Sequence, residues 1–260
     1  MAEMVFTGER IVPGSTPVPV FREHQMRYVF AGGFVRDRVV LDVASGTGIG
    51  THLLFKCGAK VCIGIELDHA SVRQAASAYS VCNFARGDAM QLCVGDEVVD
   101  VVVSFETIEH LPDPAQFLKE CRRVLRPGGL LICSTPDRTV YGWGWRNPYH
   151  VYEMSREEFR DLVEDLFGNC QLYGQKEVNY PLHVTRRLIS RFLERIRVKD
   201  IVRRILTGGP AETAPETEFD KDAFLPEFEV KPFTSGRIVK PTYLIAVARK
   251  PESVARERDG

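Results

Sequence analysis

Glycines and acidic residues follow three short apolar runs, in an arrangement suited to a nucleotide-like ligand. The turn at 42–50, DVASGTGIG, directly follows the apolar run at 39–43, and its glycines let the backbone approach a ligand closely. Glu66 ends the next run and Asp88 follows the third. Glu66 can accept hydrogen bonds from two ribose hydroxyls, and Asp88 can accept one from an exocyclic adenine amine.

Two histidines further along the chain could handle a proton on a substrate. His110 lies in SFETIEHL at 104–111, and His150 lies in the aromatic stretch WGWRNPYHVY at 143–152. An imidazole accepts a proton near neutral pH, and aromatic side chains provide wall area for an organic molecule. The alternatives are that His110 orients the following turn and that residues 147–150 form a rigid structural turn.

The elements that must position these residues are short β-branched runs alternating with helical stretches. This alternation predicts a parallel sheet with crossover helices. The predicted strands are 39–43, 60–66, 84–87, 98–103, 130–134, 171–178 and 242–249, and the predicted helices are 51–56, 70–79, 114–125 and 155–167. Because the carboxyl ends of such strands face one crevice, Asp42, Glu66 and Asp88 are expected to converge.

Three of these motifs resemble those of the class I S-adenosylmethionine-dependent methyltransferases, particularly the group that acts on small molecules. Their first motif reads roughly LDxGxGxG, and the chain has LDVASGTG at 41–48, with Ala44 in place of the usual glycine. Residues 102–111 are similar to the fourth motif, and RVLRPGG at 123–129 is similar to the turn after it. The resemblance implies an α/β, Rossmann-like sheet of seven mostly parallel strands, with helices on both faces. The last strand would be antiparallel and preceded by a helical insertion.

The resemblance also implies S-adenosylmethionine as cofactor and S-adenosylhomocysteine as product. Asp42 would support the turn, and Leu67 and Met90 would sandwich the adenine. In the N-terminal leader, Arg10 or Arg27 would pair with the methionine carboxylate and Tyr28 would hydrogen-bond it, with surface ion pairing as the alternative for each arginine. The implied cofactor-binding residues are Arg27, Tyr28, Asp42, Ala44, Ser45, Gly46, Gly48, Glu66, Leu67, Asp88, Ala89, Met90, Ser104 and Phe105, and the catalytic candidates are His110 and His150.

One domain is expected over the whole chain, with an arginine-rich insertion. Its expected parts are a cofactor-covering segment at 1–35, a cofactor-binding core at 36–180, the insertion at 184–235 and a closing strand at 240–250. The insertion begins with a basic amphipathic helix, Val184 to Leu206, and continues as an acidic, proline-bearing loop. The helix could clamp a phosphorylated or lipid-linked substrate or rest on an anionic membrane. The alternative, which the acidic loop favours, is packing on the core or on a second subunit of a homodimer.

Charge, cysteines and missing motifs narrow the possible partners. A net charge of -1 gives no general attraction to nucleic acid or to an anionic membrane, which favours a small-molecule substrate. The seven cysteines include no CxxC pair and are expected to be reduced, and a signal segment and an 18-residue apolar run are both missing, so a cytoplasmic location is expected. We expect no metal, because the acidic pattern of the magnesium-dependent catechol methyltransferases is missing.

The sequence therefore predicts a methyltransferase acting on a small molecule, with an oxygen acceptor on a sugar, glycan precursor or natural product preferred. An N-methyltransferase acting on an amino sugar, an RNA methyltransferase and a non-catalytic S-adenosylmethionine-binding protein remain as alternatives. A nicotinamide-dependent dehydrogenase is disfavoured because the turn reads GxGxG without the GxGxxG spacing.

Overall fold

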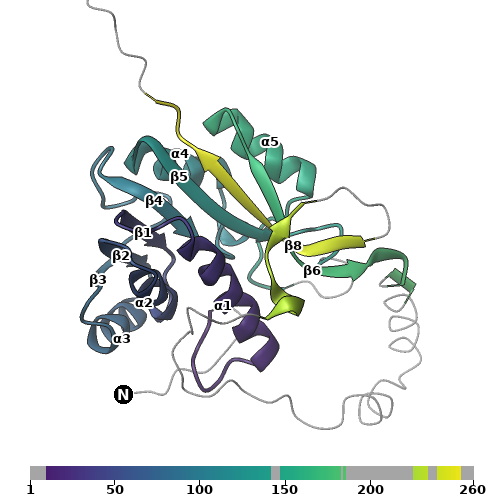
Figure 1. Cartoon of the computed structure of the whole chain (residues 1–260), viewed down its shortest axis with the longest axis horizontal. Helices are drawn as coiled ribbons and strands as arrows, with labels where there is room; N and C mark the ends of the chain where they lie inside the picture. The colour runs from purple at the N-terminus through teal and green to yellow at the C-terminus, as the bar shows by residue number, and fades with distance from the viewer. Residues whose placement is uncertain (1–9, 142–146, 183, 186–224, 234–238, 253–260) are drawn as a thin grey trace, which may run out of the picture.

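The computed structural model describes residues 10–141, 147–182, 184–185, 225–233 and 239–252 (Figure 1). The strands are β1 Val39–Val43, β2 Val61–Glu66, β3 Asn83–Arg86, β4 Val99–Ser104, β5 Leu125–Pro136, β6 Gln171–Asn179, β7 Lys231–Pro232 and β8 Val239–Arg249. The helices are α1 Val18–Gly32, α2 Ile49–Lys56, α3 His69–Ala78, α4 Pro114–Val124 and α5 Arg156–Phe167, with 3-10 turns η1 Ile108–His110 and η2 Pro226–Phe228. Most of the predicted insertion, including the basic helix from residue 186 onward, lies outside the described residues.

The strands form one sheet in the order β3-β2-β1-β4-β5-β8-β6-β7. The first five strands pair in parallel, and β8 lies antiparallel between β5 and β6. The predicted α/β class, with a mostly parallel sheet and an antiparallel last strand, is confirmed. The predicted number of seven strands was one short, because β7 has only two residues, too few for an alternating pattern to show.

Helices cover both faces of the sheet, and side-chain alternation along the strands separates two apolar clusters (Figure 1). In β1, Leu41 and Val43 face the cluster that contains α4 and α5 residues, whereas Val40 faces the cluster that contains α1 and α2 residues. Burial on both faces explains why the central strands β1 and β4 are almost entirely apolar. This packing fixes the strand ends that carry the candidate ligand-binding residues.

Two parts of the fold differ from the prediction. Helix α1 was not predicted, because its inward side includes the buried polar residues Glu23, Gln25 and Arg27, so its sequence lacks an apolar stripe. Strand β5 begins at Leu125 instead of residue 130, since Leu125 already pairs with Val99 before a β-bulge.

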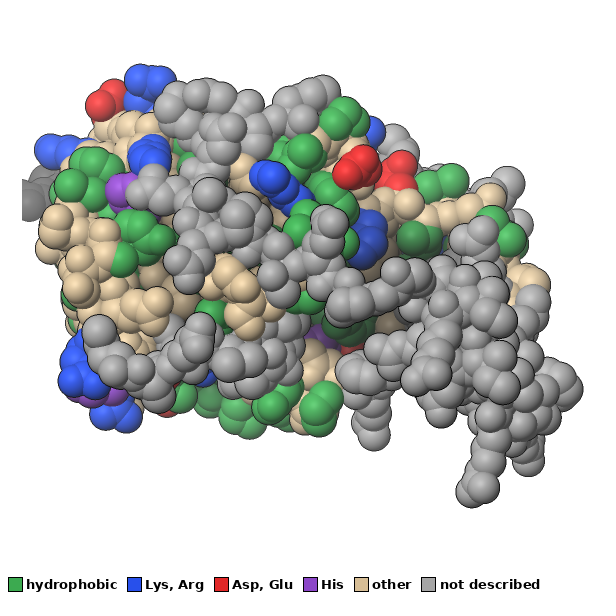
Figure 2. Space-filling model, turned by 90° about the horizontal axis from the view of Figure 1, so that it is seen from below, with side chains coloured by type: hydrophobic (Ala, Val, Ile, Leu, Met, Phe, Trp, Pro, Cys, Tyr) green, Lys and Arg blue, Asp and Glu red, His purple; other side chains and the backbone are tan. Residues whose placement is uncertain are grey.

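The described surface is mixed in character. On the face drawn in Figure 2, basic, acidic and apolar side chains of the described residues are interspersed. Among the described helices, none is both long enough and apolar enough to cross a membrane.

Candidate functional site

A cleft of about 950 Å³ lies where β1, β2 and β4 end. Its walls come from α1, the glycine-rich turn, η1 and the loop at 147–150. The predicted residues that line it are Tyr28, Ala44, Ser45, Gly46, Glu66, Leu67, Asp88, Ala89, Phe105, His110 and His150. The cleft wall formed by described residues does not include Arg27, Asp42, Gly48, Met90 or Ser104.

Three alternate residues of the glycine-rich turn have a left-handed backbone conformation. Ala44, Gly46 and Gly48 have φ values of 61°, 56° and 80°. Open space lies beside Gly46, where a Cβ would meet nothing within 4 Å. The turn therefore exposes its backbone to the cleft, as close contact with a ligand requires.

Two backbone amides hold the carboxylate of Glu66 at the rim of this turn. Its Oε2 accepts from the amide of Gly46 at 2.9 Å, and its Oε1 accepts from the amide of Asp68 at 2.9 Å. Each oxygen keeps a second acceptor position, which suits a pair of ribose hydroxyls. Asp88 also lines the cleft, and its Oδ1 accepts from the amide of Met90 at 2.8 Å.

Asp42, the third carboxylate after Glu66 and Asp88, is buried behind the residues that line the cleft. Its oxygens accept from the hydroxyl of Tyr28 at 3.1 and 3.2 Å and from that of Thr51 at 2.6 Å. Burial raises the pKa of Asp42 to about 7, although both hydroxyl donors lower it. Asp42 thus joins α1 and α2 to the turn, whereas Glu66 and Asp88 face the cleft.

Arg27 occupies a different place from the one expected of it. The side chain is fully buried, its Nη1 donates to Oε1 of Gln175 at 2.6 Å, and its guanidinium lies over the ring of Tyr243 at 4.7 Å. It therefore links α1 to β6 and β8 and does not form the cleft wall. Arg10 does line the cleft, and it pairs with Asp68 at 2.9 Å.

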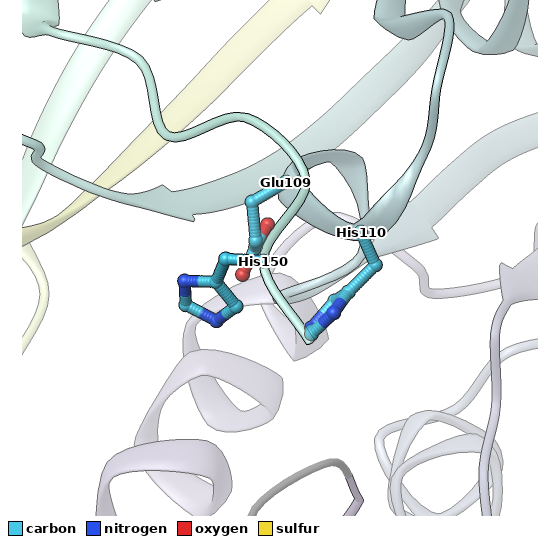
Figure 3. Close-up of side chains that lie close together, drawn as sticks. All are labelled: Glu109, His110 and His150. Carbon is cyan, nitrogen blue, oxygen red and sulfur yellow. The ribbon is translucent and has the colours of Figure 1, made fainter. Parts of the chain in front are cut away.

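The two predicted histidines meet at the other end of the cleft. Their rings lie edge to face with centroids 4.8 Å apart, and Tyr141 stacks on His150 at 5.6 Å. Figure 3 shows that His110 comes from η1 and His150 from the separate loop before α5. The fold thus brings together residues that are 40 positions apart.

Hydrogen bonds assign the tautomer of each histidine. Nδ1 of His110 lies 2.9 Å from the carbonyl oxygen of Tyr149 and must donate to it. Nδ1 of His150 donates to Glu153 at 2.7 Å, and Nε2 of His150 accepts from the amide of Asn147 at 3.0 Å. That amide is oriented by its own oxygen, which accepts from the backbone N–H of Tyr149 at 3.0 Å. His150 therefore has its proton on Nδ1 and an acceptor at Nε2, and His110 has a proton on Nδ1.

Glu109 is a site residue that the sequence reasoning missed. It is fully buried, Oε2 accepts from Thr135 at 3.4 Å, and Oε1 has no hydrogen-bond partner among the described residues. Burial, and then the nearby charge of Glu106, raise the pKa of Glu109 well above its ordinary value. The available signal was its position next to His110, in a run with acids three residues apart.

Comparison with known families identifies the part of the chain that builds this cleft. Residues 41–133, from β1 into β5, match a family model described as a methyltransferase domain. Over these residues the chain is similar to the methyltransferase domain family.

Curated relatives are similar in sequence, and a solved structure shares the fold. A "Probable S-adenosylmethionine-dependent methyltransferase" of Mycolicibacterium smegmatis is 38% identical over 61% of this chain and 63% of its own length. A "Ubiquinone biosynthesis O-methyltransferase" of Maricaulis maris is 34% identical over 54% of the chain and 62% of its own length. A solved SAM-dependent methyltransferase of Thermotoga maritima, at 20% identity, shares the fold with a TM-score of 0.57, covering 89% of this chain and 93% of its own. The chain thus spans about three-fifths of the length of these curated relatives.

The residues of the cleft suit an adenosyl ligand. Ser45 lines the cleft and its buried Oγ has no partner among the described residues, so the hydroxyl can bond to a ligand. Leu67 is 60% exposed beside Glu66, which offers an apolar surface to a base. Together with Glu66 and Asp88, these residues would hold the ribose and the adenine.

Proposed function

We propose that this protein is an S-adenosylmethionine-dependent methyltransferase that methylates a hydroxyl group of a small molecule, such as a sugar, a glycan precursor or a natural product. One observation carries the proposal: Glu66 and Asp88 line the same cleft as His110 and His150. A cofactor held at the first pair of residues would direct its reactive group toward an acceptor at the second pair.

The cofactor supplies an electrophilic methyl group on a positively charged sulfur, which becomes a neutral thioether after transfer. The chain's task is to hold the acceptor in line with that methyl group and to remove the hydroxyl proton. His110 and His150 are the candidate catalytic residues, since each places an imidazole at the cleft wall. Tyr141, which also lines the cleft, adds an aromatic face against which an organic acceptor could pack.

Oxygen is preferred over nitrogen as the acceptor atom for a chemical reason. A hydroxyl has a high pKa and gains from a proton acceptor, whereas an amine needs mainly orientation and loss of its proton. His110, His150 and the buried Glu109 could each accept a proton, which is more than the methylation of an amine requires. The relative from Maricaulis maris is named as an O-methyltransferase, which supports the same preference.

The test combines cofactor binding with turnover. Isothermal titration should show binding of S-adenosylmethionine by the wild type and by His110→Ala and His150→Ala. Methyl transfer to hydroxylated sugars and phenols should fall about 100-fold or more in the histidine variants. Cofactor binding without transfer to any acceptor would favour the non-catalytic alternative. The cytoplasmic location, the homodimer and the cofactor-covering role of residues 1–35 remain predictions.

A further inference from the structure

The group formed by Glu109, His110 and His150 has a second chemical property beyond proton transfer. One ligand-type atom from each residue lies within 4.8 Å of the others (Figure 3). Two imidazoles with one carboxylate are a common donor set of catalytic metal sites, which keep a further position open. These side chains come from two segments, η1 and the loop before α5, so an ion would join them.

The hydrogen bonds around the two imidazoles match those of metal-binding histidines. Such a histidine donates its second ring N–H to a carboxylate or a backbone carbonyl, which fixes the tautomer and directs the other nitrogen at the ion. Here Nδ1 of His150 donates to Glu153, and Nδ1 of His110 donates to the carbonyl of Tyr149. Nε2 is therefore the ring nitrogen of each histidine that would ligate an ion, after Asn147 has released that of His150.

The carboxylate supplies the independent observation. Glu109 is 0% exposed, and its Oε1 has no hydrogen-bond partner among the described residues. A buried carboxylate oxygen left unpaired is costly unless an ion or a donor approaches it. Glu106 also lines the cleft and acts on Glu109 as a like charge, which a cation would offset. The site thus has two carboxyl groups, one of which has an oxygen atom without a hydrogen-bond partner among the described residues.

From this geometry we propose that Glu109, His110 and His150 bind a divalent transition-metal ion, with Zn²⁺ the best match. Mg²⁺ is a poorer match because it prefers oxygen ligands in octahedral geometry. Ligands about 2 Å from a tetrahedral ion lie about 3.3 Å apart, so modest side-chain rotations would close the group. The contact between Asn147 and Nε2 of His150 must open when the ion binds.

With the ion bound, His110 and His150 would act as its ligands and would not accept the proton themselves. An ion held by three protein ligands keeps a position for an acceptor hydroxyl, and it would lower the pKa of that hydroxyl so that the proton passes to solvent. This role rests on the proposed function. The ion-binding site does not, because binding can be measured without any acceptor. The sequence-based expectation of no metal used a different pattern, that of the catechol enzymes.

The direct test titrates ZnCl₂ into the full-length chain after chelator treatment, with MgCl₂ in parallel. We expect one Zn²⁺ per chain and at least about 100-fold weaker Mg²⁺ binding. His110→Ala, His150→Ala and Glu109→Gln should abolish stoichiometric binding, and Glu153→Ala should weaken it about 10- to 100-fold. His69→Ala, which changes an exposed histidine on α3, should have no effect. Asn147→Ala should bind as tightly as the wild type or more tightly, since it removes a competing donor.

Zn²⁺ binding that survives both His110→Ala and His150→Ala, or a wild type that binds none, would overturn the site. Co²⁺ substitution of the wild type tests the same point without variants. Ligation by nitrogen and oxygen gives visible absorption without a thiolate charge-transfer band, whereas a strong thiolate band would place the ion on cysteines and reject the proposal.

Methyl transfer by Zn²⁺-loaded and chelated protein then separates the two proposals. Equal transfer in both forms would reject the role of the ion and leave the proposed function intact. Stoichiometric Zn²⁺ binding without transfer to any hydroxyl acceptor would keep the ion site and reject the proposed function.

Discussion

Ala44 has a left-handed backbone conformation, with a φ of 61°, although it is not a glycine. This conformation costs a non-glycine residue roughly 1–2 kcal/mol, and the family's motif has glycine at this position. Glycine also loses more backbone entropy on folding, which offsets part of the gain. We predict that Ala44→Gly raises the free energy of unfolding by about 0.5–1 kcal/mol, as measured by urea denaturation.

The matched control places the same substitution in an ordinary helical conformation. Ala76 is exposed in the middle of α3, so Ala76→Gly should lower the free energy of unfolding by up to about 1 kcal/mol. A loss of stability in both variants would show that the left-handed backbone of Ala44 carries no strain.

Asp42 should make the stability of the protein depend on pH. Its pKa is about 7 in the folded chain, above the value of about 3.9 for an unfolded aspartate. A raised pKa means that the contribution is fully present below about pH 4 and is lost as the pH rises through 7. The loss is on the order of a few kcal/mol. We predict that Asp42→Asn flattens the fall in the free energy of unfolding between about pH 5 and pH 8. Identical slopes for the two proteins would contradict this.

At the scale of elements, the crossing of α1 over α2 depends on one close contact. A Cβ at Gly50 would lie 2.0 Å from Cζ of Tyr28, and the hydroxyl of Tyr28 donates to Asp42. We predict that Gly50→Ala displaces the Tyr28 ring, lowers the free energy of unfolding by about 1–3 kcal/mol and weakens S-adenosylmethionine binding. Thermal unfolding and isothermal titration would measure the two effects.

Two variants separate steric displacement from other losses. Gly33, at the end of α1, has φ of -66° and only ordinary contact at 3.4 Å, so Gly33→Ala should change stability little. Tyr28→Phe keeps the ring and loses the hydrogen bonds to Asp42, so it should cost about 1 kcal/mol. If Gly50→Ala behaves like Gly33→Ala, α1 adjusts without cost.

The alternating β and α pattern was enough to predict the sheet, because strands buried on both faces must be apolar. It was not enough for α1. The inward polar side chains of that helix have partners from distant segments: Arg27 donates to Gln175, which lies 148 residues further along the chain. The start of β5 depends likewise on the pairing of Leu125 with Val99, a tertiary contact that overrides the helical spacing of residues 114–125.

The candidate site was partly predictable for a similar reason. Glu66, Asp88, His110 and His150 follow strand ends or motifs, and all four line the cleft. The interior position of Glu109 depends on how η1 turns after β4, and no local pattern specifies that turn. The position of a residue in a motif could not show whether it lines the cleft. Asp42, for example, belongs to the first motif but lies behind the cleft wall.

At the scale of the whole molecule, Gln175 fastens the N-terminal helix to the last part of the sheet. Its oxygen accepts from Arg27 at 2.6 Å, and its amide donates to the carbonyls of Glu23 at 2.9 Å and Phe228 at 2.7 Å. We predict that Gln175→Leu lowers the free energy of unfolding by about 2 kcal/mol or more, because it leaves a buried guanidinium without its acceptor. Gln171→Leu, at an exposed position of the same strand, is the control for urea denaturation and should be nearly neutral. Equal effects would show that Arg27 finds another acceptor.

The place of β8 between β5 and β6 has a consequence during synthesis. The parallel strands β1 to β5 can assemble as soon as residue 136 has left the ribosome, but β5 then exposes an unpaired edge. β6 emerges next and can pair only with the two residues of β7 until residues 239–249 arrive and insert between β6 and β5. A nascent chain stalled before residue 239 should therefore hold a folded first half beside an open sheet edge, the state in which chaperone capture is most favoured.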